Sequence, residues 1–157
     1  FILSAAILIA GFSVANAQAT STANQTVTLT LQNSISIALG AATGTSFTFA
    51  STSDFENGLI NVGASNFTVK SNRAWAVTVA SAAGNFTGPA LNTMPSTVLG
   101  VRLNGGSTFN SLSTTAAALT SGARGTVPFV VDYKAIPGFN FDAGTYTLSV
   151  VYTATQQ

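Results

Sequence analysis

Polar and apolar residues alternate along most of this chain, and this alternation is typical of β-strands that bury one face. The longest example spans residues 26–39, TVTLTLQNSISIAL. Its apolar parity carries Val27, Leu29, Leu31, Ile35, Ile37 and Leu39. Asn33 is the single polar residue on that parity, so we expect a bulge, a kink or a junction between two strands there.

Seven shorter segments with strand character follow: 46–50, 59–62, 67–71, 75–80, 98–103, 127–133 and 145–154. Turn sequences such as Asn104-Gly105-Gly106 and Pro137-Gly138 separate nearly all of them. Only Leu112–Leu119 is compatible with a helix, and it is too short for more than a turn or so. Many short strands separated by turns predict an all-β fold, an Ig-like or pilin-like antiparallel β-sandwich.

The composition removes most catalytic chemistry. The 157 residues include five basic and four acidic side chains, no His and no Cys. The chain therefore lacks the usual general base near neutral pH, thiol nucleophiles, disulfides and the commonest metal ligands. Its scattered lysines and arginines form no cluster of the kind that binds nucleic-acid phosphates. We expect a protein that is not an enzyme, needs no cofactor and binds no nucleic acid.

Residues 1–17 have the composition of a secretory signal peptide. The apolar run Phe1–Val14 is shorter than the roughly 20 residues that span a bilayer, and a small-x-small motif ends at Ala17. We expect a basic stretch ahead of this run, cleavage after Ala17, and secretion without a stable membrane span. The alternative is that the segment is retained as the apolar helix of a type IV pilin. The rest of the chain would form an N-terminal strand, 18–39, and a sandwich domain, 40–157.

Two loops carry candidate binding residues. Asp54, Glu56 and Asn57 place oxygen ligands ahead of a glycine, which is compatible with a calcium site; the alternative is a plain surface turn. Phe139 and Phe141, in the loop IPGFNFDAG, form a candidate contact patch; the alternative is that this loop folds over one end of the sandwich. Neither loop carries a second feature that would identify a ligand.

The C-terminal segment 143–153, AGTYTLSVVYT, resembles the last strand of secreted bacterial pilin-like and surface β-sandwich domains. Gly144 lies fourteenth from the end, as in chaperone-usher pilins. The strand positions that carry this resemblance are Gly144, Tyr146, Leu148, Val150 and Tyr152. Segment 67–79, FTVKSNRAWAVTV, is similar to a segment of cell-wall-associated WxL-type domains. The resemblance implies an extracellular structural or adhesive subunit at a bacterial cell surface.

The position and alternation of residues 26–39 suggest how such a subunit would assemble. In donor-strand exchange, an N-terminal extension adds to the open sheet of a neighbouring subunit through backbone hydrogen bonds and pocketed side chains. The alternative is that this segment is the first strand of a self-contained sandwich, because both arrangements have the same period. We expect a subunit of a pilus-like or fimbria-like filament, whose partners are copies of itself and also an assembly chaperone or surface glycans. The competing prediction is a monomeric secreted adhesion module that binds glycans or cell wall.

Overall fold

The computed structural model describes residues 18–40, 45–89 and 93–157. The expected signal peptide, 1–17, lies outside the described residues. The chain divides into two units, Phe1–Leu31 and Gln32–Gln157. In the first unit, the described residues 18–31 form no helix or strand, and all of their side chains are exposed. Regular structure is therefore confined, among the described residues, to the second unit.

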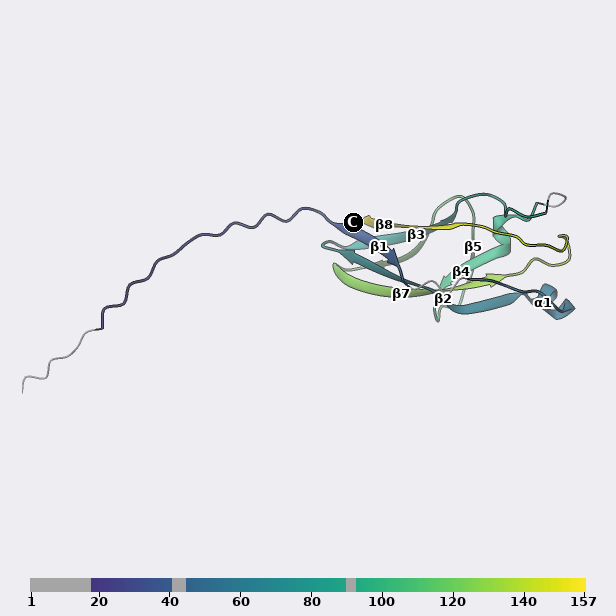
Figure 1. Cartoon of the computed structure of the whole chain (residues 1–157), viewed down its shortest axis with the longest axis horizontal. Helices are drawn as coiled ribbons and strands as arrows, with labels where there is room; N and C mark the ends of the chain where they lie inside the picture. The colour runs from purple at the N-terminus through teal and green to yellow at the C-terminus, as the bar shows by residue number, and fades with distance from the viewer. Residues whose placement is uncertain (1–17, 41–44, 90–92) are drawn as a thin grey trace, which may run out of the picture. The chain divides into compact units, whose positions relative to one another are not determined.

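The second unit consists of two antiparallel sheets, which confirms the all-β prediction (Figure 1). The larger sheet has five strands in the order β1 (Ile35–Leu39), β2 (Leu59–Ser71), β7 (Gly125–Ala135), β4 (Leu99–Leu103) and β5 (Asn110–Ser111). The smaller sheet has the order β6 (Ala117–Gly122), β3 (Trp75–Ser81) and β8 (Val150–Gln156). A short helix, α1 (Thr52–Asn57), and a single 3-10 turn, η1 (Ser96–Val98), complete the described elements.

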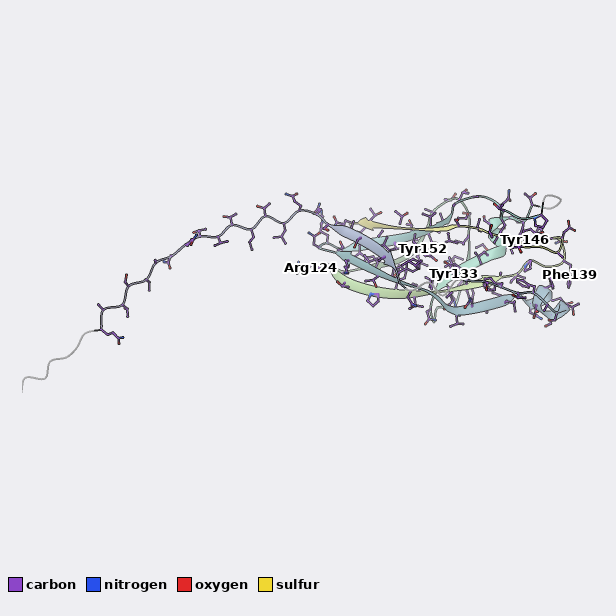
Figure 2. All side chains as sticks on the ribbon, viewed as in Figure 1. Arg124, Tyr133, Phe139, Tyr146 and Tyr152 are labelled. Carbon is purple, nitrogen blue, oxygen red and sulfur yellow. The ribbon has the colours of Figure 1, made fainter. Side chains whose placement is uncertain are left out.

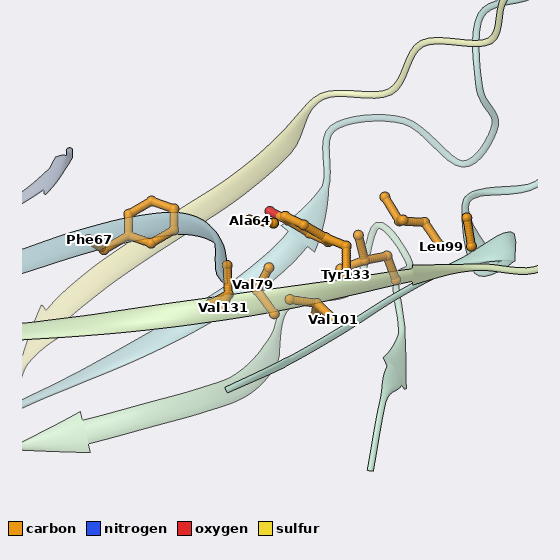
Figure 3. Close-up of a cluster of buried hydrophobic side chains, with 9 residues drawn as sticks. Ala64, Phe67, Val79, Leu99, Val101, Val131 and Tyr133 are labelled. Atoms are coloured by element: carbon orange, nitrogen blue, oxygen red, sulfur yellow. The ribbon is translucent and has the colours of Figure 1, made fainter. Parts of the chain in front are cut away.

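The core lies between the two sheets because one parity of each long strand is apolar. The smaller sheet contributes three buried apolar side chains from β3, namely Trp75, Val77 and Val79. The larger sheet contributes buried side chains from β2, β4 and β7, among them Phe67, Val101, Val131 and Tyr133 (Figure 3). Val69 of β2 is also buried, beside Trp75 and Val77. The hydroxyl groups of Tyr133 in β7 and Tyr152 in β8 share a hydrogen bond. This hydrogen bond is a polar contact between the two sheets.

Two segments predicted as separate strands, 59–62 and 67–71, form the single strand β2. The pairing of β2 with β7 shifts register between Asn61 and Ser65. Gly63 lies in this irregular stretch with a φ of 68°, a conformation that favours glycine. Its N–H donates to the buried carboxylate of Asp132 at 2.9 Å. The chain keeps one strand direction here, where the sequence predicted two separate strands, and this hydrogen bond anchors the bulge to β7.

The strand predicted at 46–50 is wrong, because these residues belong to no strand. Phe47 and Phe49 do pack against the core, as their alternation implies. The N–H of Ala50, however, donates to the carboxylate of Asp54 at the start of α1. The alternation at this point reflects side-chain packing without backbone pairing.

The helix considered for Leu112–Leu119 is also wrong. Leu112 is buried, its N–H donates to the carbonyl of Leu99, and the chain enters β6 at Ala117. The strand predicted at 145–154 begins only at Val150. The strands predicted at 75–80, 98–103 and 127–133 are confirmed, with small differences at their ends, as β3, β4 and β7.

Candidate functional site

The predicted assembly strand, 26–39, divides into two parts with different environments. We call residues 18–31 the arm. In the arm, Val27 is 74% exposed, Leu29 is 81% exposed and Leu31 is 80% exposed. Single aliphatic side chains with this degree of exposure are common on protein surfaces, but a regular row of them is not. The arm therefore carries a regular row of exposed apolar side chains, although it forms no strand of its own.

The second part is β1, which is the edge strand of the larger sheet. It pairs antiparallel with β2, and its register places Ile35 opposite Ser71, Ile37 opposite Val69 and Leu39 opposite Phe67. The side chains of Ile35 and Ile37 pack against the buried core, whereas Leu39 remains exposed. The prediction of a long strand over 26–39, broken at Asn33, is corrected, because only Ile35–Leu39 forms a ladder and residues 26–34 form no strand.

A cluster of side-chain amides marks where β1 begins. The amide oxygen of Asn72 accepts from the N–H of Ser34 at 3.0 Å, and the Asn72 amide nitrogen donates to the carbonyl of Gln32 at 2.7 Å. The side chain of Gln156, in β8, donates to the Ser34 carbonyl at 2.9 Å. We call these four residues the arm junction. Gln32 and Ser34 of the junction flank Asn33, so the expected break in the strand coincides with the point at which the chain enters the fold.

The edge strand β8 of the smaller sheet has no second strand partner among the described residues, although Gln156 near its end bonds to Ser34 ahead of β1. β8 has seven residues, VVYTATQ, which include no charged residue, proline or glycine. It pairs with β3 on one side, and no described strand pairs with its other side. Proteins usually protect such edges with charges, proline or bulges, because an open edge can accept a strand from another molecule.

The residues that carry the C-terminal resemblance fall into two groups. Leu148, Val150 and Tyr152 pack against the core. Gly144 and Tyr146 lie before β8, where Gly144 packs so close to Pro89 that a Cβ would approach its ring to 2.4 Å. Leu148 also lies before β8, so of these five positions only Val150 and Tyr152 belong to a strand.

The two phenylalanines of the predicted contact patch pack against different aromatic partners. Phe139 is 61% exposed and stacks on Phe55 of α1 with ring centroids 5.4 Å apart (Figure 2). Phe141 is half-buried and packs edge-on against Tyr146 at 6.5 Å. The patch therefore pairs Phe139 with Phe55, a residue that the sequence analysis did not single out. The apolar Phe55 within the polar run SDFEN was the available signal.

The residues of the candidate calcium site, Asp54, Glu56 and Asn57, lie in the short helix α1. They do not form the plain surface turn considered as the alternative. The Asp54 carboxylate accepts from the N–H groups of Ala50 and Ser51, both at 2.9 Å, and so caps α1. These backbone hydrogen bonds lower the pKa of Asp54. Glu56 and Asn57 are exposed, and Asn57 bonds back to Ser53. Nowhere in the described ranges do three metal-ligating side chains of the His, Cys, Asp or Glu type gather.

A buried charge in β7 is the main polar feature that the sequence analysis missed. The carboxylate of Asp132 is fully buried and accepts from Arg102 Nε at 2.9 Å, Asn104 Nδ2 at 2.8 Å and the N–H of Gly63. Burial raises the pKa of Asp132, but the hydrogen bonds from Asn104, Gly63 and Arg102 outweigh it and hold the pKa below its ordinary value. This carboxylate is fully hydrogen-bonded and paired with Arg102, and no second carboxylate is among its hydrogen-bond partners. We therefore interpret Asp132 as a structural anchor.

Comparisons with known proteins identify no family for this chain. No protein-family model matches it, and a search of curated proteins finds no match either. Within the described part of the chain, no helix has the length and apolar character needed to cross a membrane. The functional argument therefore rests on the arm, the arm junction and the open edge of β8.

Proposed function

We propose that this protein is an extracellular structural subunit of a pilus-like or fimbria-like filament. In this proposal, the arm of one copy adds as a strand to an open sheet edge of the next copy. The observation that carries the proposal is the row of exposed aliphatic side chains, Val27, Leu29 and Leu31. Burying an aliphatic side chain of this size stabilises a complex by about 1.5–3 kcal/mol. Strand addition would also satisfy the backbone groups of the arm.

The best acceptor edge is that of β8. Among the edge strands it is the longest, and it has no charged residue, proline or glycine. The arm and β8 are different surfaces of the same chain, so each copy would donate at one and accept at the other. A head-to-tail contact of this kind produces an open filament unless its rotation closes a ring.

The remaining sequence features fit the same proposal. An Ig-like or pilin-like sandwich would supply the acceptor, and a signal peptide at 1–17 would export the chain to the bacterial cell surface. An assembly chaperone would keep the arm and the acceptor edge covered before polymerisation. Strand faces rich in threonine and serine remain soluble with very few charges, which suits an extracellular polymer exposed to variable pH and salt.

The test compares two chains, one that begins at Gln18 and one that begins at Gln32. The second chain keeps β1 and the arm junction, so it removes the arm without removing a strand of the fold. We expect filaments or a ladder of oligomers from the first chain in light scattering and negative-stain microscopy, and a folded monomer from the second. A folded monomer from both chains would overturn the proposal.

A pair of substitutions on opposite parities of the arm gives a matched control. Leu29→Asp places a charge on the apolar face, and Thr30→Asp places the same charge on the polar face. If the arm inserts as a strand, only the inward parity must be apolar. We expect Leu29→Asp to abolish assembly and Thr30→Asp to preserve it. Equal loss from both would point to charge repulsion and would contradict strand insertion.

The competing function is a monomeric adhesion module that binds glycans or cell wall. The observation in its favour is the Phe139 ring, which is exposed and is held in place by stacking on Phe55. Exposed aromatic rings can stack on sugars. A monomeric chain from Gln18 whose binding to isolated cell walls is lost on Phe139→Ala would favour this module over the filament subunit.

A further inference from the structure

A depression of about 410 Å³ lies on the outer face of the larger sheet. Its floor includes Lys134 of β7, whose neighbours Tyr133 and Ala135 point into the core, so Lys134 points outward. Its size falls within the range of small-ligand pockets, about 300–1,000 Å³. The polar and aromatic side chains around it are Thr97, Ser107, Thr108, Phe109, Ser111 and Lys134.

The aromatic wall of this depression is fixed before any ligand arrives. The Arg102 guanidinium lies 4.2 Å from the centre of the Phe109 ring, and Arg102 is itself held by the fully buried Asp132. On β4, Gly100 leaves room for this side chain, because a Cβ there would come within 3.1 Å of the Phe109 Cβ. The ring is therefore positioned by a chain of contacts that reaches the core. Such preorganisation lowers the entropy cost of binding.

The cation of this depression lacks a counter-ion. The ion pair between Arg102 and Asp132 does not involve Lys134. No carboxylate lines the depression beside Lys134, and the carboxylate of Asp54 is engaged in capping α1. Lys134 thus presents an ammonium group beside four hydroxyl side chains and one aromatic ring.

We propose that this depression binds a saccharide that carries a carboxylate, of the hexuronic acid type. Lys134 would donate to the carboxylate, and the hydroxyl groups of Thr97, Ser107, Thr108 and Ser111 would exchange hydrogen bonds with sugar hydroxyls. The apolar C–H face of the sugar would lie on Phe109. One cation suits one carboxylate, whereas a nucleotide or polyphosphate would need several cations. This site is separate from the arm and from β8, so it does not depend on the filament proposal.

The experiment titrates the full protein with a glucuronic acid oligosaccharide and with the matching glucose oligosaccharide, using calorimetry. We expect the acidic oligosaccharide to bind at least about tenfold more tightly, which is the effect of one charge-assisted hydrogen bond. Lys134→Gln should remove this preference. Lys70→Gln is the matched control, because Lys70 lines a different depression that is rich in serine and has no aromatic ring.

A second pair of variants tests the ring, with folding checked by circular dichroism. Phe109→Ala should weaken binding of the acidic oligosaccharide, and Phe109→Trp should restore it, because tryptophan keeps a stacking face. Three outcomes would overturn the proposal: no binding of either oligosaccharide, equal binding of both, or binding of acetate as tight as that of the acidic oligosaccharide. A loss of affinity on Lys70→Gln equal to that on Lys134→Gln would also overturn it.

Discussion

Residues 27–31 and 35–39 carry the same alternation of apolar and polar side chains, yet they have different environments. Ile35 and Ile37 pack against the core and form a ladder with β2. Val27, Leu29 and Leu31 lie in no strand and are at least 74% exposed. The difference shows that period two specifies which face of a segment is to be buried. Whether that face is buried within the same molecule depends on an available sheet edge.

The boundary between these two regions is set by polar contacts. Asn72 and Gln156 bond to the backbone of Gln32 and Ser34, just ahead of β1. The sequence marks the same place with Asn33, the one polar residue on the apolar parity. A polar residue on the apolar parity interrupts the buried face of a strand, so it is not expected in the middle of one continuous strand. The comparison therefore supports separate roles for the arm and for β1.

We expect the largest effect on stability from a change at Asp132. This residue anchors Gly63 of β2, and β2 is the strand with which β1 pairs. Asp132→Ala leaves Arg102 without its buried partner and releases the N–H of Gly63 in β2. We expect it to lower the free energy of unfolding by about 3–5 kcal/mol, measured by urea denaturation. Hydrogen exchange should accelerate in β1 and remain fast in the arm. The exposed carboxylate variant Glu56→Ala is the control, and an equally small effect of Asp132→Ala would contradict the anchor.

The next effect compares equivalent side chains on the two sides of the junction. Ile37→Ala removes a side chain packed on both parts of the core and should cost about 2 kcal/mol of unfolding free energy, near the lower end for buried aliphatic truncations. Leu29→Ala should change it by less than about 0.5 kcal/mol. Both values are measured by denaturation at low protein concentration. A similar cost for both variants would mean that the arm packs within its own molecule.

A smaller effect should follow from loosening the junction itself. Asn72→Ala removes the side-chain hydrogen bonds to Ser34 and Gln32, and these bonds are solvent-exposed. We expect a loss of about 1 kcal/mol and faster hydrogen exchange at the start of β1, because the arm would then lengthen into the strand. The neighbouring variant Arg73→Ala should leave this exchange unchanged. Unaltered exchange in Asn72→Ala would show that the β1 ladder alone defines the boundary.

We expect the smallest effect in the pH dependence of folding stability, to which Asp132 contributes and the arm does not. The pKa of Asp132 is lower in the folded protein, so its stabilising contribution is complete above the ordinary value of 3.8 and is lost as the pH falls through the folded pKa. The arm, 18–31, has no ionisable side chain and should not respond. Urea midpoints at about pH 7 and about pH 3 measure this loss. Asp132→Asn should make the remaining pH dependence shallower, and an unchanged slope would contradict the assignment.

The sequence correctly predicted strands where adjacent residues alternate between apolar and polar side chains. β3, β4 and β7 alternate cleanly between turns, and each forms near its expected bounds. The prediction failed where a long-range contact decides the backbone. Residues 46–50 alternate but are directed into α1 by Asp54, and 59–62 joins 67–71 because Asp132 holds Gly63 from the neighbouring strand.

Long-range contacts also limited the prediction of the candidate site, of which only the exposed parts could be predicted. The apolar parity of the arm and the exposure of Phe139 follow from adjacent residues. The arm junction needs Asn72 and Gln156 to meet across 84 positions, and the ring of Phe109 is positioned through Arg102 and Asp132, which lie 30 positions apart. Period and composition contain no information on such pairs, because sheet order is set by the whole fold.

The arm junction also has a mechanical consequence. If the proposed filament forms, tension on it would enter each subunit through the arm and pass at Gln32 into β1. The five residue pairs between β1 and β2 form an antiparallel ladder, whose hydrogen bonds lie perpendicular to the strands. A pull along β1 therefore loads these bonds in shear, all at once, and not one after another as in peeling. The short first strand would then be the element that sets how much force a subunit withstands.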